Sequence, residues 1–156
     1  WSDNKTVEIR SPEATRPWQH VLEPLSGYLN LGQVLYENDS LHGEAFNFGP
    51  RAEQNHTVKQ LLKDLSVYWH FSNVDDAFTV TDNIPFHEAG LLKLNCDKAL
   101  FHFKWQANLE YKDTIKFTSE WYYDFYKSEK DIFDKTLEQI CEYENMAKQK
   151  ELNWTE

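Results

Sequence analysis

Arg16 is the residue whose chemistry is easiest to interpret, because it stands alone just before Pro17-Trp18 and a helical pattern. The planar guanidinium of arginine offers a fork of N–H donors that matches phosphate oxygens. An isolated arginine can also be an ordinary surface charge. The residues alone therefore leave two interpretations of Arg16, a diphosphate-binding group or a solvated cation.

Trp18, Gln19 and His20 follow almost directly and form the rest of the first candidate group. Trp18 could contact a ligand or anchor the helix by packing, since aromatic side chains dominate core energetics. His20 near a helix start should stay neutral, because the helix dipole disfavours a cation there. It could cap the helix or position a neighbour.

The remaining candidates lie in two loops. The loop from Arg51 to His56 contains Asn55 and His56, and the loop at 83–90 contains His87 and Glu88. Binding groups concentrate in loops carried by a rigid scaffold. We therefore expect both loops to line a ligand pocket.

The sequence contains no pattern that accounts for catalysis by this chain. There is no Gly-x-Ser-x-Gly elbow, His-Glu-x-x-His helix or P-loop. The six histidines are scattered without metal-ligand spacing. A paired-carboxylate hydrolase is an open alternative, although abundant acids usually form a solvated surface. We predict no catalytic and no metal-binding residue.

Composition and charge narrow the class of partner. The 26 Asp and Glu outnumber 16 Lys and Arg, and the net charge of −10 disfavours nucleic acid and anionic membranes. Without a long apolar run or a signal peptide, we expect a cytoplasmic chain. Cys96 and Cys141 show no framework spacing, which favours free thiols. The start at Trp1 rather than Met fits a fragment or a processed product.

Apolar periodicity and turn residues predict the elements that position these candidates. Strands are expected at 7–10, 45–48, 78–80 and 91–94, and helices at 20–37, 57–70, 96–103, 108–127 and 136–150. Thr57-x-x-Gln60 and Thr136-x-x-Gln139 are predicted capping boxes. The first helix should bury one apolar face, made of Val21, Leu25, Tyr28, Leu29, Gly32, Leu35 and Tyr36. We expect residues 151–156 to form a frayed tail.

Several blocks together resemble one family, and they span nearly the whole chain. They are Arg16-Pro17-Trp18-Gln19-His20-Val21-Leu22-Glu23-Pro24-Leu25 with its continuation to Leu29, and the segments 43–50, 86–89, 92–99 and 136–144. This set is similar to the part of CDP-glucose 4,6-dehydratases, which are extended short-chain dehydrogenases/reductases, that follows the cofactor-binding region. Relatives acting on dTDP- or GDP-sugars usually carry Arg-Asp-Trp or Arg-Asp-Phe where this chain has Arg16-Pro17-Trp18. Lys104, Ala107 and Asn95 depart from the family's usual Gly, Pro and Asp.

The resemblance implies an α+β fold with a small mixed sheet and several packed helices. The parent protein would be α/β, and this chain would correspond to it without its Rossmann region. Residues 1–150 would be the C-terminal sugar-nucleotide-binding domain, with Arg16 on the diphosphate. The Gly-rich turn of an NAD-binding domain is absent. The family's Tyr-x-x-x-Lys pair should lie upstream, so we interpret Tyr123-Asp-Phe-Tyr-Lys127 as a coincidence on an aromatic helix.

By the same resemblance, the parent enzyme is a lyase that uses NAD to convert CDP-glucose to CDP-4-keto-6-deoxyglucose for dideoxysugars of lipopolysaccharide. We expect this chain alone to bind no NAD and to be inactive, with a separate NAD-binding half or a second copy as partner. The alternative is a non-catalytic interaction module on the same scaffold. A third interpretation, an unrelated small α+β enzyme, requires an accidental family match.

Overall fold

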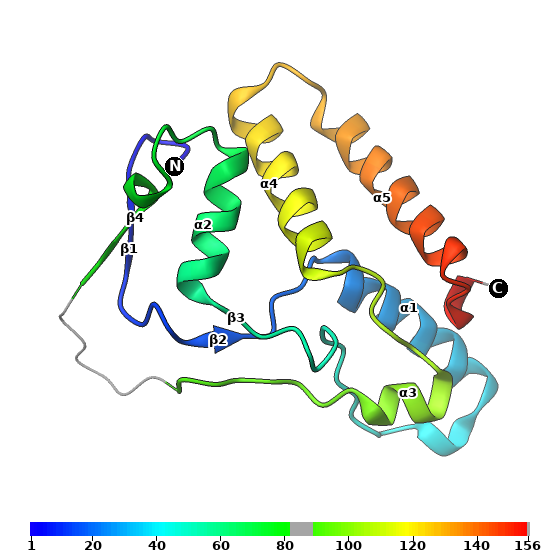
Figure 1. The fold of residues 1–156 in the computed structure, drawn as a ribbon. Coiled ribbons are helices and arrows are strands. Elements are labelled where there is room, and N and C mark those ends of the chain that lie inside the picture. The colour runs from blue at the N-terminus through cyan, green and yellow to red at the C-terminus, as the bar shows by residue number, and fades with distance from the viewer. Residues whose placement is uncertain (82–88, 156) are drawn as a thin grey trace.

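The structure is a computed structural model that describes residues 1–81 and 89–155 (Figure 1). The described residues form short strands and α-helices, in the order β1 Val7–Ile9, β2 Thr15–Arg16, α1 Leu22–Glu37, β3 His56–Thr57, α2 Val58–Tyr68, β4 Phe78–Val80, α3 Asp97–Phe103, α4 Tyr111–Lys127 and α5 Ile132–Gln149. Three 3₁₀ turns, at Asp39–Leu41, Val74–Ala77 and Asn153–Thr155, complete the list. The predicted α+β class is confirmed.

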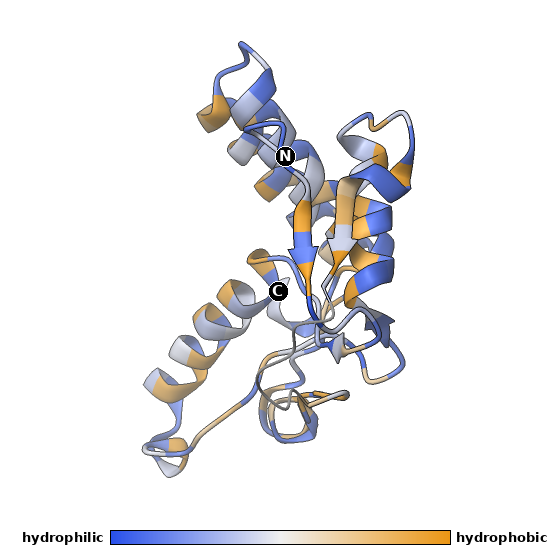
Figure 2. Cartoon of the chain, turned by 90° about the vertical axis from the view of Figure 1, so that its left-hand side faces the viewer, coloured by the Kyte–Doolittle hydropathy of each residue, from blue (hydrophilic) through white to orange (hydrophobic). Residues whose placement is uncertain are grey.

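The strands pair two by two, once in parallel and once in antiparallel orientation. β1 runs parallel to β4 with Ile9 opposite Val80, and β2 runs antiparallel to β3 with Arg16 opposite His56. Figure 2 shows the alternation of apolar and polar residues along β1 and β4. Ile9 and Phe78 are buried there against Val58 from α2. Each ladder thus fixes a strand close to a helix.

Two predicted strands, 45–48 and 91–94, are not formed. Phe48 is buried against Phe103 and Trp105, but residues 45–48 take part in no ladder of the described chain. At 91–94, Leu91 makes only an isolated bridge with Thr15. Their apolar pattern correctly indicates an extended segment against a core, whereas a strand also needs a partner strand.

The predicted helices form, with two corrections at their starts. Thr57 caps α2, since its side chain accepts the N–H of Gln60 at 3.1 Å. The Gln60 amide donates to Asp64 instead, so only the hydroxyl half of the predicted capping box forms. α5 begins at Ile132 after the cap Asp131, so the predicted start at Thr136 is wrong. The Thr136 hydroxyl donates to the Ile132 carbonyl inside the helix, at 2.7 Å. α4 is capped by Glu110 rather than Asn108.

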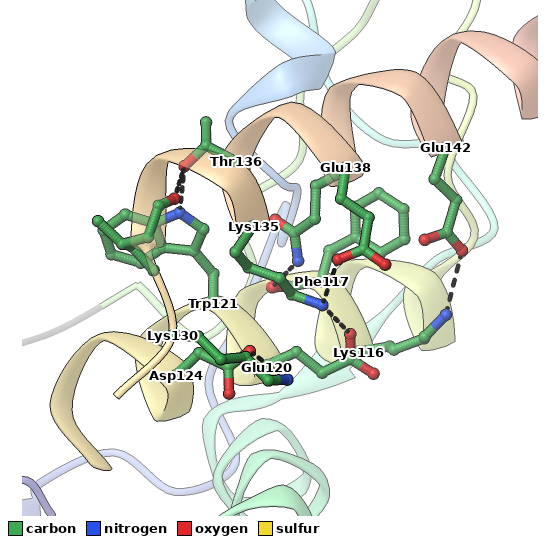
Figure 3. A network of polar contacts seen from close by, with 12 residues as sticks. Lys116, Phe117, Glu120, Trp121, Asp124, Lys130, Lys135, Thr136, Glu138 and Glu142 are labelled. Carbon is green, nitrogen blue, oxygen red and sulfur yellow. Dashed lines mark hydrogen bonds and ion pairs between the residues drawn. The ribbon is translucent and has the colours of Figure 1, made fainter. Parts of the chain in front are cut away.

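α4 and α5 lie side by side and are joined by polar contacts (Figure 3). Lys135, whose side chain is mostly buried, contacts Glu120 at 3.1 Å, which explains why the charged stretch 131–135 does not interrupt the helix. The Trp121 indole N–H donates to the Thr136 hydroxyl at 2.9 Å. The Gln139 amide donates to the Phe117 carbonyl at 2.9 Å. These contacts hold the helix pair in one register.

The chain after α5 packs against the body of the protein, contrary to the expected frayed tail. Leu152 is buried, and the Trp154 ring stacks on Tyr143 with centroids 5.6 Å apart. Apolar burial of this kind outweighs the freedom of a chain end. Cys96 and Cys141 are free thiols, as expected.

The apolar face of α1 that we predicted to be buried is exposed instead. Leu29 and Tyr36 are 77% and 92% accessible to solvent, whereas Glu23, Ser26 and Gly27 face the interior. Helical periodicity identifies which residues share a face but not which face points inward. The reason for this inversion lies in the contacts of Glu23, described below.

Candidate functional site

The candidate site centres on the β2–β3 ladder, where three distant segments meet. Arg16 and His56 are direct partners across this ladder. Thr15 also bonds to the third segment, because its N–H donates to the Gly90 carbonyl at 2.8 Å. The ladder lies centrally, between α2 and the long extended segment that leads into α3 (Figure 1). Two predicted candidates thus become neighbours although forty positions separate them in the sequence.

The Arg16 side chain is half-buried. Its Nη1 group donates to the Thr15 carbonyl at 2.8 Å and to the Ala89 carbonyl at 2.9 Å. These bonds fix the guanidinium beside the segment that carries two further candidates. Those candidates, His87 and Glu88, lie outside the described residues.

Trp18 acts on the same ladder through its indole group. The indole N–H donates to the His56 carbonyl at 2.9 Å, and the side chain is half-buried. This bond holds the end of β3 against the segment that follows β2. In this structure Trp18 therefore positions the His56 backbone, which matches the packing interpretation better than direct contact with a ligand.

His56 is held on its other side by an aromatic stack. Its imidazole lies 3.5 Å from the Tyr111 ring with an angle of 10° between the planes. The Tyr111 hydroxyl donates to Asp64 at 2.9 Å. Burial, followed by the contact with Asp64, raises the pKa of Tyr111, so the phenol remains a donor. Asn55, the preceding candidate, is exposed.

Gln19 and His20 turn away from the ladder and into the base of α1. The Gln19 amide donates to the Phe48 carbonyl at 3.1 Å. His20 is 9% exposed, accepts the Leu22 N–H at Nδ1 and meets the edge of Phe117. Burial lowers the pKa of His20 to about 4. It is neutral, as expected, but the cause is desolvation rather than the helix dipole.

A cavity of about 670 Å³ lies between the loop 49–53 and the segment 93–97. Arg51 and Lys93 contribute cations to its lining, and Glu53 and Asp97 contribute carboxylates. Lys93 donates to the Ala52 carbonyl at 2.8 Å, which ties the two walls together. The same loop continues to Asn55 and His56, so the cavity and the β2–β3 ladder are joined by continuous chain.

Glu23 joins α1 to the segment before α4 and to α5, and no sequence motif pointed to it. Its carboxylate is 1% exposed and accepts the backbone N–H groups of Asn108 and Leu109 and the Tyr143 hydroxyl. Ser26, one turn along α1, accepts the Trp105 indole N–H at 3.1 Å. A glutamate on a helix usually indicates a solvated face, so only its position opposite the apolar stripe could have suggested burial.

Neither a metal site nor a membrane-spanning helix is found in the part of the chain that the structure describes. In residues 1–81 and 89–155, no group of three or more His, Cys, Asp or Glu side chains is arranged to hold a metal ion. Over the same residues, no helix has both the length and the apolar character needed to cross a membrane. Tyr123 and Lys127 are occupied structurally, since Tyr123 packs on Trp69 and Lys127 donates to the Ser2 carbonyl.

Comparison with known proteins identifies a relative of this chain. The chain is 37% identical over 145 residues to CDP-glucose 4,6-dehydratase of Salmonella typhimurium. The aligned part makes up 92% of this chain and 39% of the relative. No protein-family model matches the chain. The resemblance to CDP-glucose 4,6-dehydratases predicted from the sequence motifs is thereby confirmed, and the partial coverage is consistent with a C-terminal portion.

Proposed function

We propose that the chain is the substrate-binding part of a sugar-nucleotide dehydratase and holds CDP-glucose at the β2–β3 ladder and the adjoining cavity. The observation that carries this proposal is the pairing of Arg16 with His56 on one ladder, in a chain 37% identical to a CDP-glucose 4,6-dehydratase. The complete enzyme would convert CDP-glucose to CDP-4-keto-6-deoxyglucose, a precursor of the dideoxysugars of lipopolysaccharide.

The roles follow from the charges and donors at the site. A chain with a net charge of −10 repels a diphosphate unless cations are concentrated locally. Arg16 supplies the guanidinium donors for the diphosphate. At the cavity Arg51 and Lys93 add hydrogen-bond donors, although Glu53 and Asp97 offset their charge. Asn55 and His56 offer polar groups on the stretch of chain that joins the cavity to the ladder. His87 and Glu88 remain candidates from the sequence, outside the described residues.

The described residues do not fit NAD. Dinucleotide binding places the pyrophosphate at a helix N-terminus that follows a Gly-rich turn. In the described chain, none of the helices α1 to α5 begins after such a turn. We therefore assign substrate binding to this chain and assign hydride transfer to a different part of the parent enzyme.

Calorimetry of the chain with four ligands tests this assignment. CDP and CDP-glucose should bind, dTDP-glucose should bind more weakly, and NAD should give no heat. Arg16→Ala should weaken CDP binding by about 10-fold to 100-fold, the usual loss for a charged hydrogen bond. The matched control is Arg10→Ala, because Arg10 is an exposed arginine of the same N-terminal segment. Tight NAD binding with no response to CDP would contradict the assignment.

A second candidate function, protein interaction without ligand binding, is favoured by the exposed apolar face of α1. In that case the chain should form an assembly that ignores CDP and survives Arg16→Ala. Analytical ultracentrifugation with and without CDP separates the two functions. A monomer that loses CDP binding on Arg16→Ala supports substrate binding.

A further inference from the structure

Another cavity lies where the N-terminal residues meet the C-terminal ends of α2 and α4 (Figure 1). Its volume is about 510 Å³, within the range of about 300–1,000 Å³ that small-molecule sites occupy. We call it the Trp69 cavity, because Trp69 at the C-terminal end of α2 lines it. The length of α2, about 16 Å, separates this cavity from the β2–β3 ladder at the other end of the helix. The Trp69 cavity is therefore not the site proposed for CDP-glucose.

Aromatic rings from three segments form one wall of the Trp69 cavity. The Trp69 ring meets Trp1 and Tyr123 edge-on, with centroids 5.8 Å apart in both pairs. Phe71 meets Trp1 at 5.3 Å. The Trp1 indole N–H donates to the Ala77 carbonyl at 2.7 Å, which holds this ring in place. All four rings line the cavity and are only partly buried, so the wall offers a fixed apolar surface to a ligand.

Polar side chains of both charge signs surround this wall. Lys5 and Lys127 provide ammonium donors, and Asp76 provides a carboxylate acceptor. Lys127 donates to the Ser2 carbonyl at 3.0 Å, and Lys5 lies 4.0 Å from the Asp3 carboxylate. Because the charges are mixed, an anion gains little net attraction here. The rim instead matches a neutral ligand that both donates and accepts hydrogen bonds.

Two rim residues adopt a backbone conformation that favours glycine. Asn4 and His70 have φ angles of 57° and 56°, in the left-handed region that is unfavourable for residues with a Cβ atom. His70 directly follows the cap of α2, where glycine is the usual residue, and its ring meets the edge of Tyr123 at 5.2 Å. Non-glycine residues in such conformations are concentrated at functional sites. Both of these side chains line the Trp69 cavity.

We propose that the Trp69 cavity binds a neutral carbohydrate, in the form of a pyranose ring. One face of a pyranose consists of C–H groups that pack on an aromatic ring, and its edge carries hydroxyl groups that donate and accept hydrogen bonds. The aromatic wall takes the C–H face, and Asn4, His70 and Asp76 take the hydroxyl groups. An apolar ligand would remove water from these polar groups without replacing its hydrogen bonds. An anion would be repelled by Asp76.

Nuclear magnetic resonance titration of the whole chain with the neutral methyl glycosides of glucose, galactose and mannose tests the proposal. At least one should shift the amide signals of residues 4–6 and 69–72, with a dissociation constant on the order of 1 mM, as expected for so small a ligand. Pyrophosphate and indole, the anionic and apolar probes, should leave these signals unchanged. Arg16→Ala should not alter glycoside binding, so this test can fail or succeed independently of the proposed function.

Glycine substitutions on the rim separate binding from folding. Asn4→Gly and His70→Gly relieve the left-handed backbone, so the melting temperature should not fall appreciably. Each should nevertheless weaken glycoside binding about 3-fold to 10-fold, because one hydrogen bond to the ligand is lost. The matched control is Glu151→Gly, since Glu151 has a φ of 52° but follows α5 and does not line the cavity. It should leave binding unchanged.

Three results would overturn the proposal. One is that no glycoside shifts the signals of residues 69–72 up to roughly 0.1 M, about 100 times the expected dissociation constant. Another is that pyrophosphate or indole shifts them more strongly than any glycoside, since the cavity would then suit an anion or an apolar ligand. The third is glycoside binding that survives both Asn4→Gly and His70→Gly without loss, because the rim would then not hold the hydroxyl groups.

Discussion

The Glu23 carboxylate accepts the backbone N–H of Leu109 at 2.5 Å, although 86 positions separate the two residues. The neighbouring Asn108 N–H also donates to this carboxylate, and the Lys150 ammonium donates to the Asn108 carbonyl. One buried side chain therefore joins α1 to the segment before α4 and, through Tyr143, to α5. The scaffold that carries the β2–β3 ladder depends on this junction.

Removing the Glu23 carboxylate should destabilise the chain strongly. Glu23→Ala leaves two buried N–H groups without acceptors, and we expect a loss of about 3–5 kcal/mol in the free energy of unfolding. Glu23→Gln keeps one oxygen for both donors and should cost much less. Urea denaturation measures both values. Equal losses for Ala and Gln would show that the hydrogen bonds are not the cause.

The same residue should give a defined pH dependence. Burial raises the pKa of Glu23 above its ordinary 4.5, and the backbone hydrogen bonds oppose that shift only in part. As pH rises above 4.5, the unfolded chain releases this proton more readily than the folded chain, so stability falls until the folded pKa is passed. Glu23→Gln should remove this decline. The difference between the two proteins' unfolding free energies, followed from pH 4 upward, is the measurement.

His20 should give the opposite dependence. Its pKa is lowered from 6.5 to about 4. Between pH 6.5 and about pH 4 the unfolded chain therefore binds a proton at His20 that the folded chain does not bind. The contribution of His20 to stability is present above pH 6.5 and is lost as pH falls, by about 3 kcal/mol. His20→Asn should flatten this part of the curve. The exposed His42, changed to Asn, is the control. A slope retained in His20→Asn would contradict the assignment.

Capping and periodicity rules predicted much of the fold, because the contacts responsible join residues that are close in the sequence. Thr57 caps α2 through Gln60, and the alternation in β1 and β4 produced real strands. A predicted helix start was wrong where another local contact competed with the predicted cap. Asp131 accepts the Phe133 N–H at 2.8 Å, so α5 begins one turn before the predicted start at Thr136.

The candidate site was only partly predictable, since its arrangement depends on long-range contacts. Sequence order grouped Gln19 and His20 with Arg16, but the start of α1 turns both into the interior. The stack of His56 on Tyr111 joins residues with no common motif. The inward face of α1 could not be foreseen either, because the acceptor that fixes it bonds to a segment 86 positions away.

Substitution of two glycines of α1 by alanine should change the stability of the chain in opposite directions. Gly27 has no room for a methyl group, since an added Cβ would lie 2.3 Å from the rigid Phe48 ring, whereas nothing lies within 4 Å of one at Gly32. Gly27→Ala should therefore cost about 1–3 kcal/mol through overpacking. Gly32→Ala should stabilise the helix by about 0.5–1 kcal/mol. Thermal unfolding of both variants checks the contrast, and stabilisation by Gly27→Ala would place Phe48 elsewhere.

The stack between His56 and Tyr111 should control the orientation of the candidate imidazole. Tyr111→Phe keeps the ring and removes only the bond to Asp64, so we expect a loss of about 1 kcal/mol in stability and little change in CDP affinity. Tyr111→Ala removes the stack and should lower stability by about 3 kcal/mol or more.

Nuclear magnetic resonance of the His56 ring gives the direct readout for both variants. A ring stacked at 3.5 Å shifts the imidazole protons upfield, and this shift should persist in Tyr111→Phe and disappear in Tyr111→Ala. Tyr36→Ala, at a tyrosine that is 92% exposed, should leave it unchanged. If Tyr111→Ala lost the shift but kept full CDP affinity, the His56 imidazole would not belong to the binding site, and the diphosphate contact would rest on Arg16 without it.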